Sequence, residues 1–350
     1  MSIHTTLLAS ACTVSALTLA FVQSSQSQTP PPEEEIESPW VCYDGGEGPG
    51  KGKHIVLVSG DEEYRSEEAL PQLGKILSTH HGFRCTVLFA VNPESGEIDP
   101  DDRVHIPGLA GVRDADLLVL FTRFRELPDA DMKYIVDHVE SGKPLFGIRT
   151  ATHAFSYAED SKSRYAKWSW NNKDWPGGFG KQVLGETWVN HHGHHGKQST
   201  RGVIPEGSAA HPILRGVSDI WGPTDVYGIR ELPADALVLV EGSVLSGMNA
   251  GDAPLEGPKN DPRMPLIWTR ERQLEGGVVQ RVITSTIGAS TDLASAGLRR
   301  AFVNACYWGT GLEDRIPNES NVSIVGTYEP TDFGFGAFKR GVFPADHALE

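Results

Sequence analysis

Four short apolar runs, separated by polar turns and helical stretches, dominate the first half of the chain. They occupy residues 54–59, 83–88, 116–121 and 144–148. The first and third runs contain unbroken apolar stretches instead of alternating residues, which indicates strands buried on both faces. Between the third and fourth runs, apolar positions follow the three-and-four spacing of an amphipathic helix over 129–140, at Met132, Ile135, Val136 and Val139.

The regular alternation of strands and helices predicts the fold class. We expect an α/β protein with a doubly wound, mainly parallel sheet, in which the four runs are neighbouring parallel strands. A first helix is predicted to start at a Ser66 cap and to end before Gly82. Later strands are predicted at 237–241, 265–270 and 278–285, and a closing amphipathic helix at 295–307.

The fourth run ends in an abrupt change of character that we regard as the centre of the molecule. Gly147 permits a close approach of other groups, and Arg149 follows the strand in a Gly-x-Arg-x-Ala pattern. A strand that stops at a sharp turn before a helix has the geometry of a nucleophile elbow. Arginine stays protonated and is no nucleophile, so the pattern indicates a binding platform; the alternative is a core strand followed by a polar loop.

Residues 158–200 interrupt the alternation with a segment rich in tryptophan, glycine and histidine. It contains Trp168, Trp170, Trp175 and Trp188, followed by the run His191-His192-Gly193-His194-His195. Such a composition is unusual for a plain linker. We therefore expect an ordered Trp/His-rich insertion that lies over the elbow, with most of the tryptophans filling its own core.

Composition and charge exclude several classes of function. The net charge of −15 over 350 residues argues against nucleic-acid binding, which requires clustered Lys and Arg, and against docking on anionic membranes. Within the body of the chain, no uninterrupted apolar run of about eighteen residues occurs, so no integral membrane segment is expected after removal of a signal.

The N-terminal composition predicts an exported protein. Residues 1–28 lack charged side chains and have an apolar centre, as in a secretory signal peptide, with an uncleaved anchor as the alternative. Residues 29–50 are predicted to be a linker, 51–312 the α/β domain, and 313–350 a C-terminal tail packed on that domain. The expected location is secreted or periplasmic. Beyond the signal, Cys42, Cys85 and Cys306 match no metal or disulfide framework.

Several stretches, taken in order, resemble the trehalose-utilisation (ThuA-like) family, whose fold is like that of class I glutamine amidotransferases. The stretches are Gly147-Ile148-Arg149 with His153 and Phe155, Leu184 to His191, His211 to Gly216, Asp225-Val226-Tyr227, Gly277 to Gly288, and Phe302 to Trp308. The resemblance implies a link to disaccharide metabolism, notably to sugars oxidised to 3-keto forms. The sequence departs from the family at the elbow, where Arg149 replaces a common His, and at Ile287-Gly288-Ala289, where Leu-Gly-His is common.

The candidate site residues follow the expected strand ends and the histidine run. Catalytic candidates are Arg149, His153, His191, Asp61 and Glu62; substrate-binding candidates are Arg123, Arg125, Tyr64 and Trp188. Imidazole is the commonest transition-metal ligand, so His191 and His195 are candidates for a divalent metal, the one cofactor considered. The alternatives are a hydrogen-bonded loop for the histidines, a solvated turn for the carboxylates and ion pairs for the arginines.

These residues lead to two hypotheses of function. The first is a carbohydrate-active enzyme that acts on a disaccharide or keto-sugar by acid/base chemistry, with or without a metal. The second is a non-catalytic carbohydrate-binding or scaffold module that has lost the elbow nucleophile. Glutamine amidotransfer is set aside because no cysteine stands at the elbow. The first hypothesis requires Arg149, His153 and His191 to converge.

Overall fold

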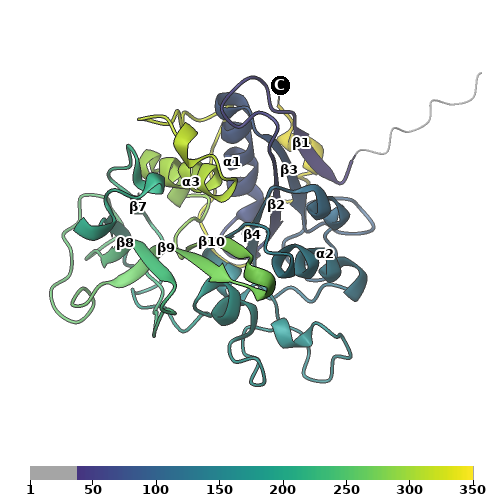
Figure 1. Ribbon diagram of the computed structural model, residues 1–350, viewed down its shortest axis with the longest axis horizontal. Helices are drawn as coiled ribbons and strands as arrows, with labels where there is room; N and C mark the ends of the chain where they lie inside the picture. Colours follow the sequence, from purple (N-terminus) through teal and green to yellow (C-terminus); the bar gives the residue numbers. More distant parts are fainter. Residues whose placement is uncertain (1–37, 350) are drawn as a thin grey trace, which may run out of the picture. The chain divides into compact units, whose positions relative to one another are not determined.

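The computed structural model describes residues 38–349, which form a ten-stranded sheet with helices packed against it (Figure 1). The strand order is β1-β3-β2-β4-β5-β10-β9-β8-β6-β7. The strands are β1 (Trp40–Tyr43), β2 (His54–Gly60), β3 (Arg84–Phe89), β4 (Leu117–Thr122), β5 (Leu145–Ile148), β6 (Thr200–Val203), β7 (Trp221–Gly222), β8 (Ala236–Val244), β9 (Met264–Gln273) and β10 (Val279–Ser285).

The four predicted strands of the first half form the parallel part of the sheet. β2 pairs in parallel with β3 on one side and with β4 on the other, and β5 lies between β4 and β10, parallel to both. All residues of β4 and β5 are buried, as their unbroken apolar sequences indicate. The carboxyl ends of these strands consequently meet at one edge of the sheet.

The other half of the sheet is antiparallel, so the expectation of a mainly parallel sheet holds only for part of it. β10 pairs antiparallel with β9, β9 with β8, β8 with β6, and β6 with β7. The sheet is therefore mixed. β6 and β7 are short and contain glycine and polar residues, so their sequences lack a strand pattern.

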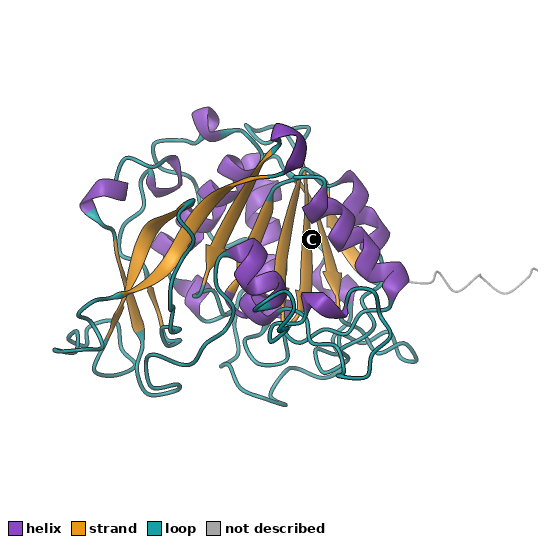
Figure 2. Ribbon diagram, turned by 60° about the horizontal axis from the view of Figure 1, so that its bottom comes forward, coloured by secondary structure: helices purple, strands orange, loops and turns teal. Residues whose placement is uncertain are grey.

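Helices cover both faces of the sheet (Figure 2). Residues of α1 (Ser66–His81) and α3 (Ala296–Gly309) share one core cluster with Ile55 and Leu57 of β2. Residues of α2 (Asp129–Glu140) and of the insertion share a second cluster with Val56 and Val58. The alternation of β2 side chains between two helical layers is the doubly wound arrangement expected for this part of the chain.

Two local expectations at the start of the domain are wrong. Residues 40–43 were assigned to the linker, but they form β1, which pairs antiparallel with β3 and buries Tyr43. Ser66 was expected to cap α1, yet it is the first helical residue and its hydroxyl contacts Ser59 at 2.8 Å. The predicted signal peptide, 1–28, and the first part of the predicted linker lie outside the described residues.

Three turns at the carboxyl edge of the parallel strands contain non-glycine residues in the left-handed region. They are Arg65 after β2 (φ 59°), Phe124 after β4 (φ 51°) and Arg149 after β5 (φ 47°). Such conformations cost about 1–3 kcal/mol each and occur preferentially at functional sites. The strained turns therefore indicate that the candidate functional site lies at this edge of the sheet.

The C-terminal tail lies against α1 and the strand ends. Glu68 of α1 accepts hydrogen bonds from the backbone N–H and the hydroxyl of Thr331, at 2.7 and 2.8 Å. Phe333 packs against Tyr64, with ring centroids 5.6 Å apart. Within residues 38–349, no helix has the length and apolar character needed to cross a membrane.

Glu67, in the first turn of α1, carries a pH-dependent contribution to stability. Both carboxylate oxygens are buried without a hydrogen-bond partner, and burial raises its pKa from 4.5 to about 8, with Arg65 opposing the shift. Because the folded state binds this proton more tightly, the contribution is complete below pH 4.5 and is lost as the pH rises towards 8. Glu67→Gln should therefore stabilise the protein at pH 9 and have little effect at pH 4.5, as measured by thermal unfolding.

The difference in free energy of unfolding between Glu67→Gln and wild type should change with pH by up to about 1.4 kcal/mol per pH unit between pH 4.5 and 8. Glu140→Gln, at an exposed end of α2, is the control and should show no such pH-dependent difference. Equal destabilisation by Glu67→Gln at every pH would show instead that Glu67 is charged and paired with Arg65.

Candidate functional site

Arg149 occupies the apex of the elbow but lies beneath the site instead of projecting from it. Its side chain is 0% exposed, and Nη1 donates to the carbonyl oxygens of Asp225, at 2.9 Å, and Thr286, at 2.5 Å. The guanidinium lies between the rings of Tyr64 and Tyr227, each 4.2 Å from its central carbon. The burial of Arg149 leaves no exposed surface for the expected direct contact with a ligand, and its contacts are all with protein groups.

Arg149 forms a buried ion pair with the carboxylate of Asp225. Nη2 of Arg149 lies 3.1 Å from Oδ1 of this carboxylate, and both side chains are fully buried. Burial opposes the charge of Asp225, but hydrogen bonds with His191 and His195 and the charge of Arg149 outweigh it and lower the Asp225 pKa. Burial likewise opposes the charge of Arg149, whose pKa is nevertheless raised by Tyr227, Tyr64 and Asp225. The result is a buried carboxylate held in its ionised form.

Backbone pairing brings the histidine run to this carboxylate. His191 forms an antiparallel bridge with Tyr227, and the N–H of His192 donates to the carbonyl of Val226 at 2.8 Å. Gly193 lies close to this carboxylate residue, since a Cβ there would meet the Cβ of Asp225 at 3.1 Å. The insertion thus returns to the strand ends and places His191 directly over Asp225.

His191, His195 and Asp225 form a cluster that fits a divalent metal ion. Each offers one ligand atom, and these atoms lie within 4.8 Å of one another. Nδ1 of His191 is 2.8 Å from Oδ2 of Asp225, and Nδ1 of His195 is 3.2 Å from Oδ1. Ligand atoms that bind one metal at about 2.1 Å are separated by roughly 3 Å. The two contacts with Asp225 are already that short, and the widest separation in the cluster, up to 4.8 Å, would have to shorten. The two imidazoles are 34% and 36% exposed, which leaves their outer side open to ligand.

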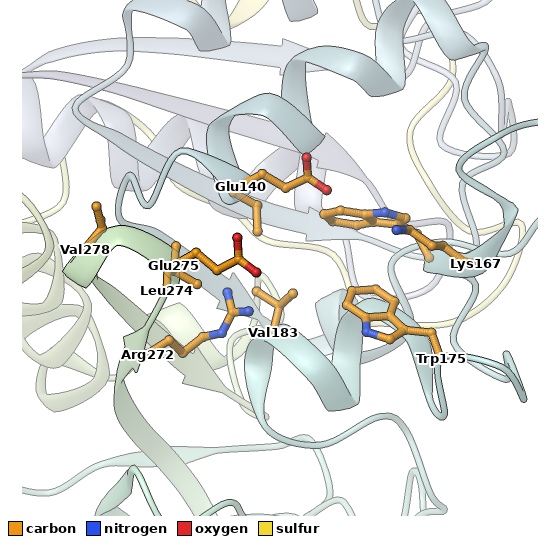
Figure 3. Close-up of a pocket in the computed structure, with 10 residues that line it drawn as sticks. Glu140, Lys167, Trp175, Val183, Arg272, Leu274, Glu275 and Val278 are labelled. Carbon is orange, nitrogen blue, oxygen red and sulfur yellow. The ribbon is translucent and has the colours of Figure 1, made fainter.

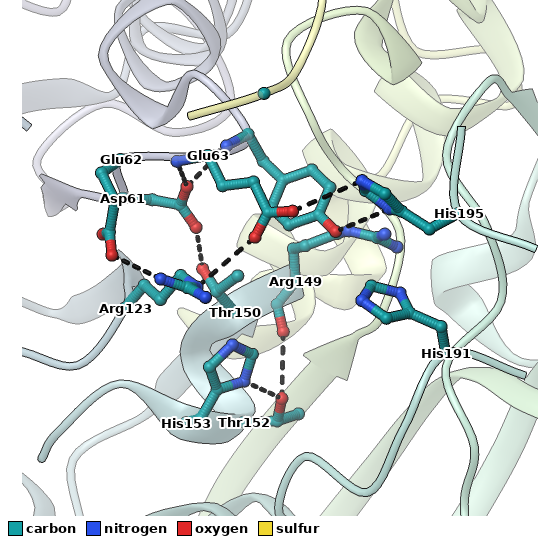
Figure 4. A network of polar contacts seen from close by, with 12 residues as sticks. Asp61, Glu62, Glu63, Arg123, Arg149, Thr150, Thr152, His153, His191 and His195 are labelled. Carbon is teal, nitrogen blue, oxygen red and sulfur yellow. Dashed lines mark hydrogen bonds and ion pairs between the residues drawn. The ribbon is translucent and has the colours of Figure 1, made fainter. Parts of the chain in front are cut away.

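Glu63 supplies the outer partner that such a histidine usually has. Its Oε1 lies 3.5 Å from Nε2 of His195 (Figure 4). Because Nδ1 of His195 lies 3.2 Å from Asp225, the two ring nitrogens of His195 face two different carboxylates. A carboxylate on the second nitrogen fixes the tautomer and the ring orientation of a metal-binding histidine. Burial and the neighbouring charge of Asp61 raise the pKa of Glu63, against the opposing effect of Arg123.

The predicted carboxylates Asp61 and Glu62 both lie near the cluster, but they are engaged in holding the turn. Asp61 is fully buried and accepts hydrogen bonds from the N–H groups of Glu63 and Tyr64, each at 2.6 Å, and from the hydroxyl of Thr150. Glu62 forms ion pairs with Arg123 and Arg125. Glu63, the residue between them and Tyr64, is the one that reaches a histidine.

Among the predicted cations, Arg123 and Arg125 have different environments. Arg125 is fully buried, and it donates to Glu62 and to the carbonyl oxygens of Pro100, Asp102 and Arg123. Its position does not support a role in ligand binding. Arg123 is 17% exposed, pairs with Glu62 and Glu63, and lies at the rim of the cluster. Of the two, only Arg123 is placed to meet a ligand.

His153 lies beside the cluster in an aromatic environment. Its ring is 4.9 Å from Phe124, 5.7 Å from Trp188 and 6.2 Å from Tyr227. Burial first, and then the charges of Arg123 and Arg149, hold the His153 pKa well below its ordinary value. A neutral imidazole suits hydrogen bonding better than the predicted transfer of protons near neutral pH. Trp188 also contacts His191 at 5.8 Å and remains partly exposed, whereas Tyr64 is buried.

The structure therefore brings Arg149, His153 and His191 around Tyr227, and it adds residues that the sequence did not identify as functional. The additions are Asp225, Tyr227 and Glu63. Asp225 and Tyr227 belong to a stretch that carries the family resemblance, which was the available signal for them. Glu63 follows β2 together with the two predicted carboxylates, but sequence alone did not determine which of the three faces the histidines.

A separate cavity of about 410 Å³ lies away from this cluster. It is bordered by the end of α2, the insertion and the turn between β9 and β10, with Arg272, Glu275, Trp175 and Val183 facing one another (Figure 3). Because Leu274 and Val278 precede β10, the cavity lies near the amino end of that strand. The histidine cluster lies at the opposite, carboxyl end of the parallel strands, so the two features are distinct.

Fold and cluster together define a mixed α/β protein with a His/His/Asp group at the carboxyl edge of its parallel strands. No protein-family model and no curated protein sequence matches the chain. Similar solved structures include two ThuA-like proteins, from Parabacteroides merdae and Bacteroides uniformis, and a glutamine amidotransferase from Methylobacillus flagellatus.

These similarities are distant. The P. merdae protein is 13% identical, with a TM-score of 0.48 and coverage of 81% of this chain and 98% of that one. The B. uniformis protein is 12% identical, with a TM-score of 0.43 and coverage of 76% and 95%. The amidotransferase is 11% identical, with a TM-score of 0.33 and coverage of 80% and 99%. The resemblance expected from the motifs is thus found again among solved structures.

Proposed function

We propose that the chain is a metal-assisted carbohydrate-active enzyme that acts on a disaccharide or keto-sugar by acid/base chemistry. The observation that carries this proposal is the His191, His195 and Asp225 cluster, whose three ligand atoms lie within 4.8 Å of one another. The substrate class rests on the resemblance of the sequence motifs to the trehalose-utilisation family. The apolar segment before residue 28 supports action outside the cytoplasm.

The residues of the chain have distinct roles in this proposal. His191, His195 and Asp225 bind the metal, Glu63 orients His195, and Arg149 keeps Asp225 ionised. A bound divalent ion would polarise a carbonyl oxygen of the sugar and so make the hydrogen on the neighbouring carbon more acidic. The partly exposed ring of Trp188, beside His191, can contact the apolar face of the sugar.

The alternative is a non-catalytic carbohydrate-binding module, because the elbow presents a buried arginine in place of a nucleophile. Within residues 38–349, Cys42, Cys85 and Cys306 are free thiols, and none of them takes part in the polar network at the strand ends. This arrangement provides no support for glutamine amidotransfer by a cysteine nucleophile.

Elemental analysis combined with a substrate panel tests the proposal. Purified protein should contain a near-stoichiometric transition metal and should convert a keto-disaccharide in a panel of ordinary and 3-keto disaccharides, followed by mass spectrometry. Treatment with a chelator should abolish conversion, and the same metal should restore it. Sugar binding without conversion in the metal-loaded protein would favour the binding module, and a protein that retains no metal would refute metal assistance.

A further inference from the structure

A segment of the C-terminal tail, residues 331–336, is fixed to the loop that carries Glu63. We call this segment the C-terminal strap. The N–H of Gly334 donates to the carbonyl oxygen of Glu63 at 2.7 Å, and the guanidinium of Arg65 donates to the carbonyl of Gly334. At its start, Thr331 is bound by the carboxylate of Glu68. The strap is therefore hydrogen-bonded both to the turn after β2, through Gly334, and to the first turn of α1, through Thr331.

The strap borders the histidine cluster directly. The ring of Phe333 lies 5.1 Å from the ring of His195 and 5.6 Å from that of Tyr64. His195 therefore has Phe333 as one ring neighbour and His191, 4.7 Å away, as another.

Phe335 is the unusual residue of the strap. Its side chain is 63% exposed, the highest value among the exposed large hydrophobic residues in 38–349. It is flanked by Gly334 (φ 147°) and Gly336 (φ 65°), backbone conformations that favour glycine and that set the direction of the intervening residue. One face of its ring lies 5.0 Å from the guanidinium carbon of Arg123, which is itself 4.4 Å from the ring of Phe124.

We propose that Phe335 is an aromatic platform for a sugar ring, which packs on the face turned away from Arg123. This inference rests on the proposed carbohydrate function and assigns it a second contact surface. The apolar C–H face of a pyranose packs favourably on an aromatic ring, while its hydroxyl groups need polar partners at the periphery. Arg123, on the other face, is held by Glu62 and Glu63 and supports the ring from behind. The strap thus places the non-reacting part of a disaccharide, while the metal cluster acts on the other ring.

Binding measurements on Phe335 variants test the platform. The dissociation constant for the best sugar of the panel should rise about five- to tenfold in Phe335→Ala, in keeping with the energy of an aromatic contact. Phe335→Tyr should bind like wild type, and Phe335→Leu should lie between, because leucine keeps apolar area without an aromatic face. The metal content should be unchanged in all three. Leu349→Ala removes another exposed apolar side chain of the tail and should leave binding unaffected.

The outcomes separate this inference from the function on which it rests. If wild type binds no sugar of the panel, this measurement alone refutes both the carbohydrate function and the platform. If wild type binds but Phe335→Ala binds equally well, only the platform is overturned. Loss of metal in Phe335→Ala would also overturn it, because the strap would then support the cluster instead of contacting sugar.

Discussion

Replacing Arg149 by methionine should lower the free energy of unfolding by about 3–5 kcal/mol, the usual result of breaking a buried ion pair on one side. Asp225 would remain fully buried and would lose the guanidinium that now lies 3.1 Å from its Oδ1. The carbonyl oxygens of Asp225 and Thr286 would lose their donor, and the space between Tyr64 and Tyr227 would lose its cation. Thermal unfolding should show a midpoint lower by on the order of 10 °C.

Two further variants identify the cause of this loss. Methionine has no greater strain than arginine at φ 47°, since both are non-glycine residues, so backbone strain does not account for the difference. Arg123→Met should be much milder, because Glu62 keeps its pair with Arg125. Combining Arg149→Met with Asp225→Asn should cost less than the sum of the two single changes. Additive losses, or an unchanged midpoint in Arg149→Met, would show that the pair is not coupled.

The parallel half of the fold was predictable because its signal is local. Unbroken apolar runs identify strands buried on both faces, and the amphipathic spacing of 129–140 identifies the helix between two of them. The chain therefore specifies β2, β3, β4 and β5 within a few residues each. The elbow after β5 was predictable for the same reason, as the end of a buried strand next to small and polar residues.

The antiparallel half and the tail were less predictable because their pairing is distant in sequence. β6 has four residues and pairs with β8, from which it is separated by about 30 residues of turns and short helices. The strap contains two phenylalanines, each followed by a glycine, and no periodic pattern, so nothing in the sequence indicates its attachment to the loop after β2. Its contacts with Glu63 and Arg65 join segments separated by most of the domain.

The candidate site was predictable in its histidines but not in its acidic partner. His191 and His195 stand out in a run of four histidines, and their separation of four residues gave no diagnostic metal pattern. Asp225 becomes the shared partner only because residues 190–193 pair with 225–228 in the folded chain. The sequence did not show that Arg149 pairs with a buried carboxylate instead of binding a ligand, because its partner Asp225 lies 76 residues further along the chain.

His191→Ala should abolish metal retention and conversion of the keto-sugar, and it should leave the thermal midpoint of metal-free protein nearly unchanged. The side chain is 34% exposed, and Asp225 keeps Arg149 and His195 as partners after the change. Loss of one of three metal ligands should weaken metal binding by at least about a hundredfold, more than removal of an outer partner. Metal content after gel filtration and initial rates at saturating sugar measure the two effects.

His194→Ala is the matched control, because it changes an exposed histidine of the same run whose ring is not part of the cluster. It should retain both metal and activity. The metal content and activity of Glu63→Gln should lie between those of His194→Ala and His191→Ala. This change removes the charge facing Nε2 of His195 and leaves all three metal ligands in place. A graded loss across His194→Ala, Glu63→Gln and His191→Ala therefore indicates a metal centre with an outer carboxylate. A large fall in the thermal midpoint of His191→Ala, with metal and sugar still bound, would mean that the histidines serve only to hold the insertion against the strand ends.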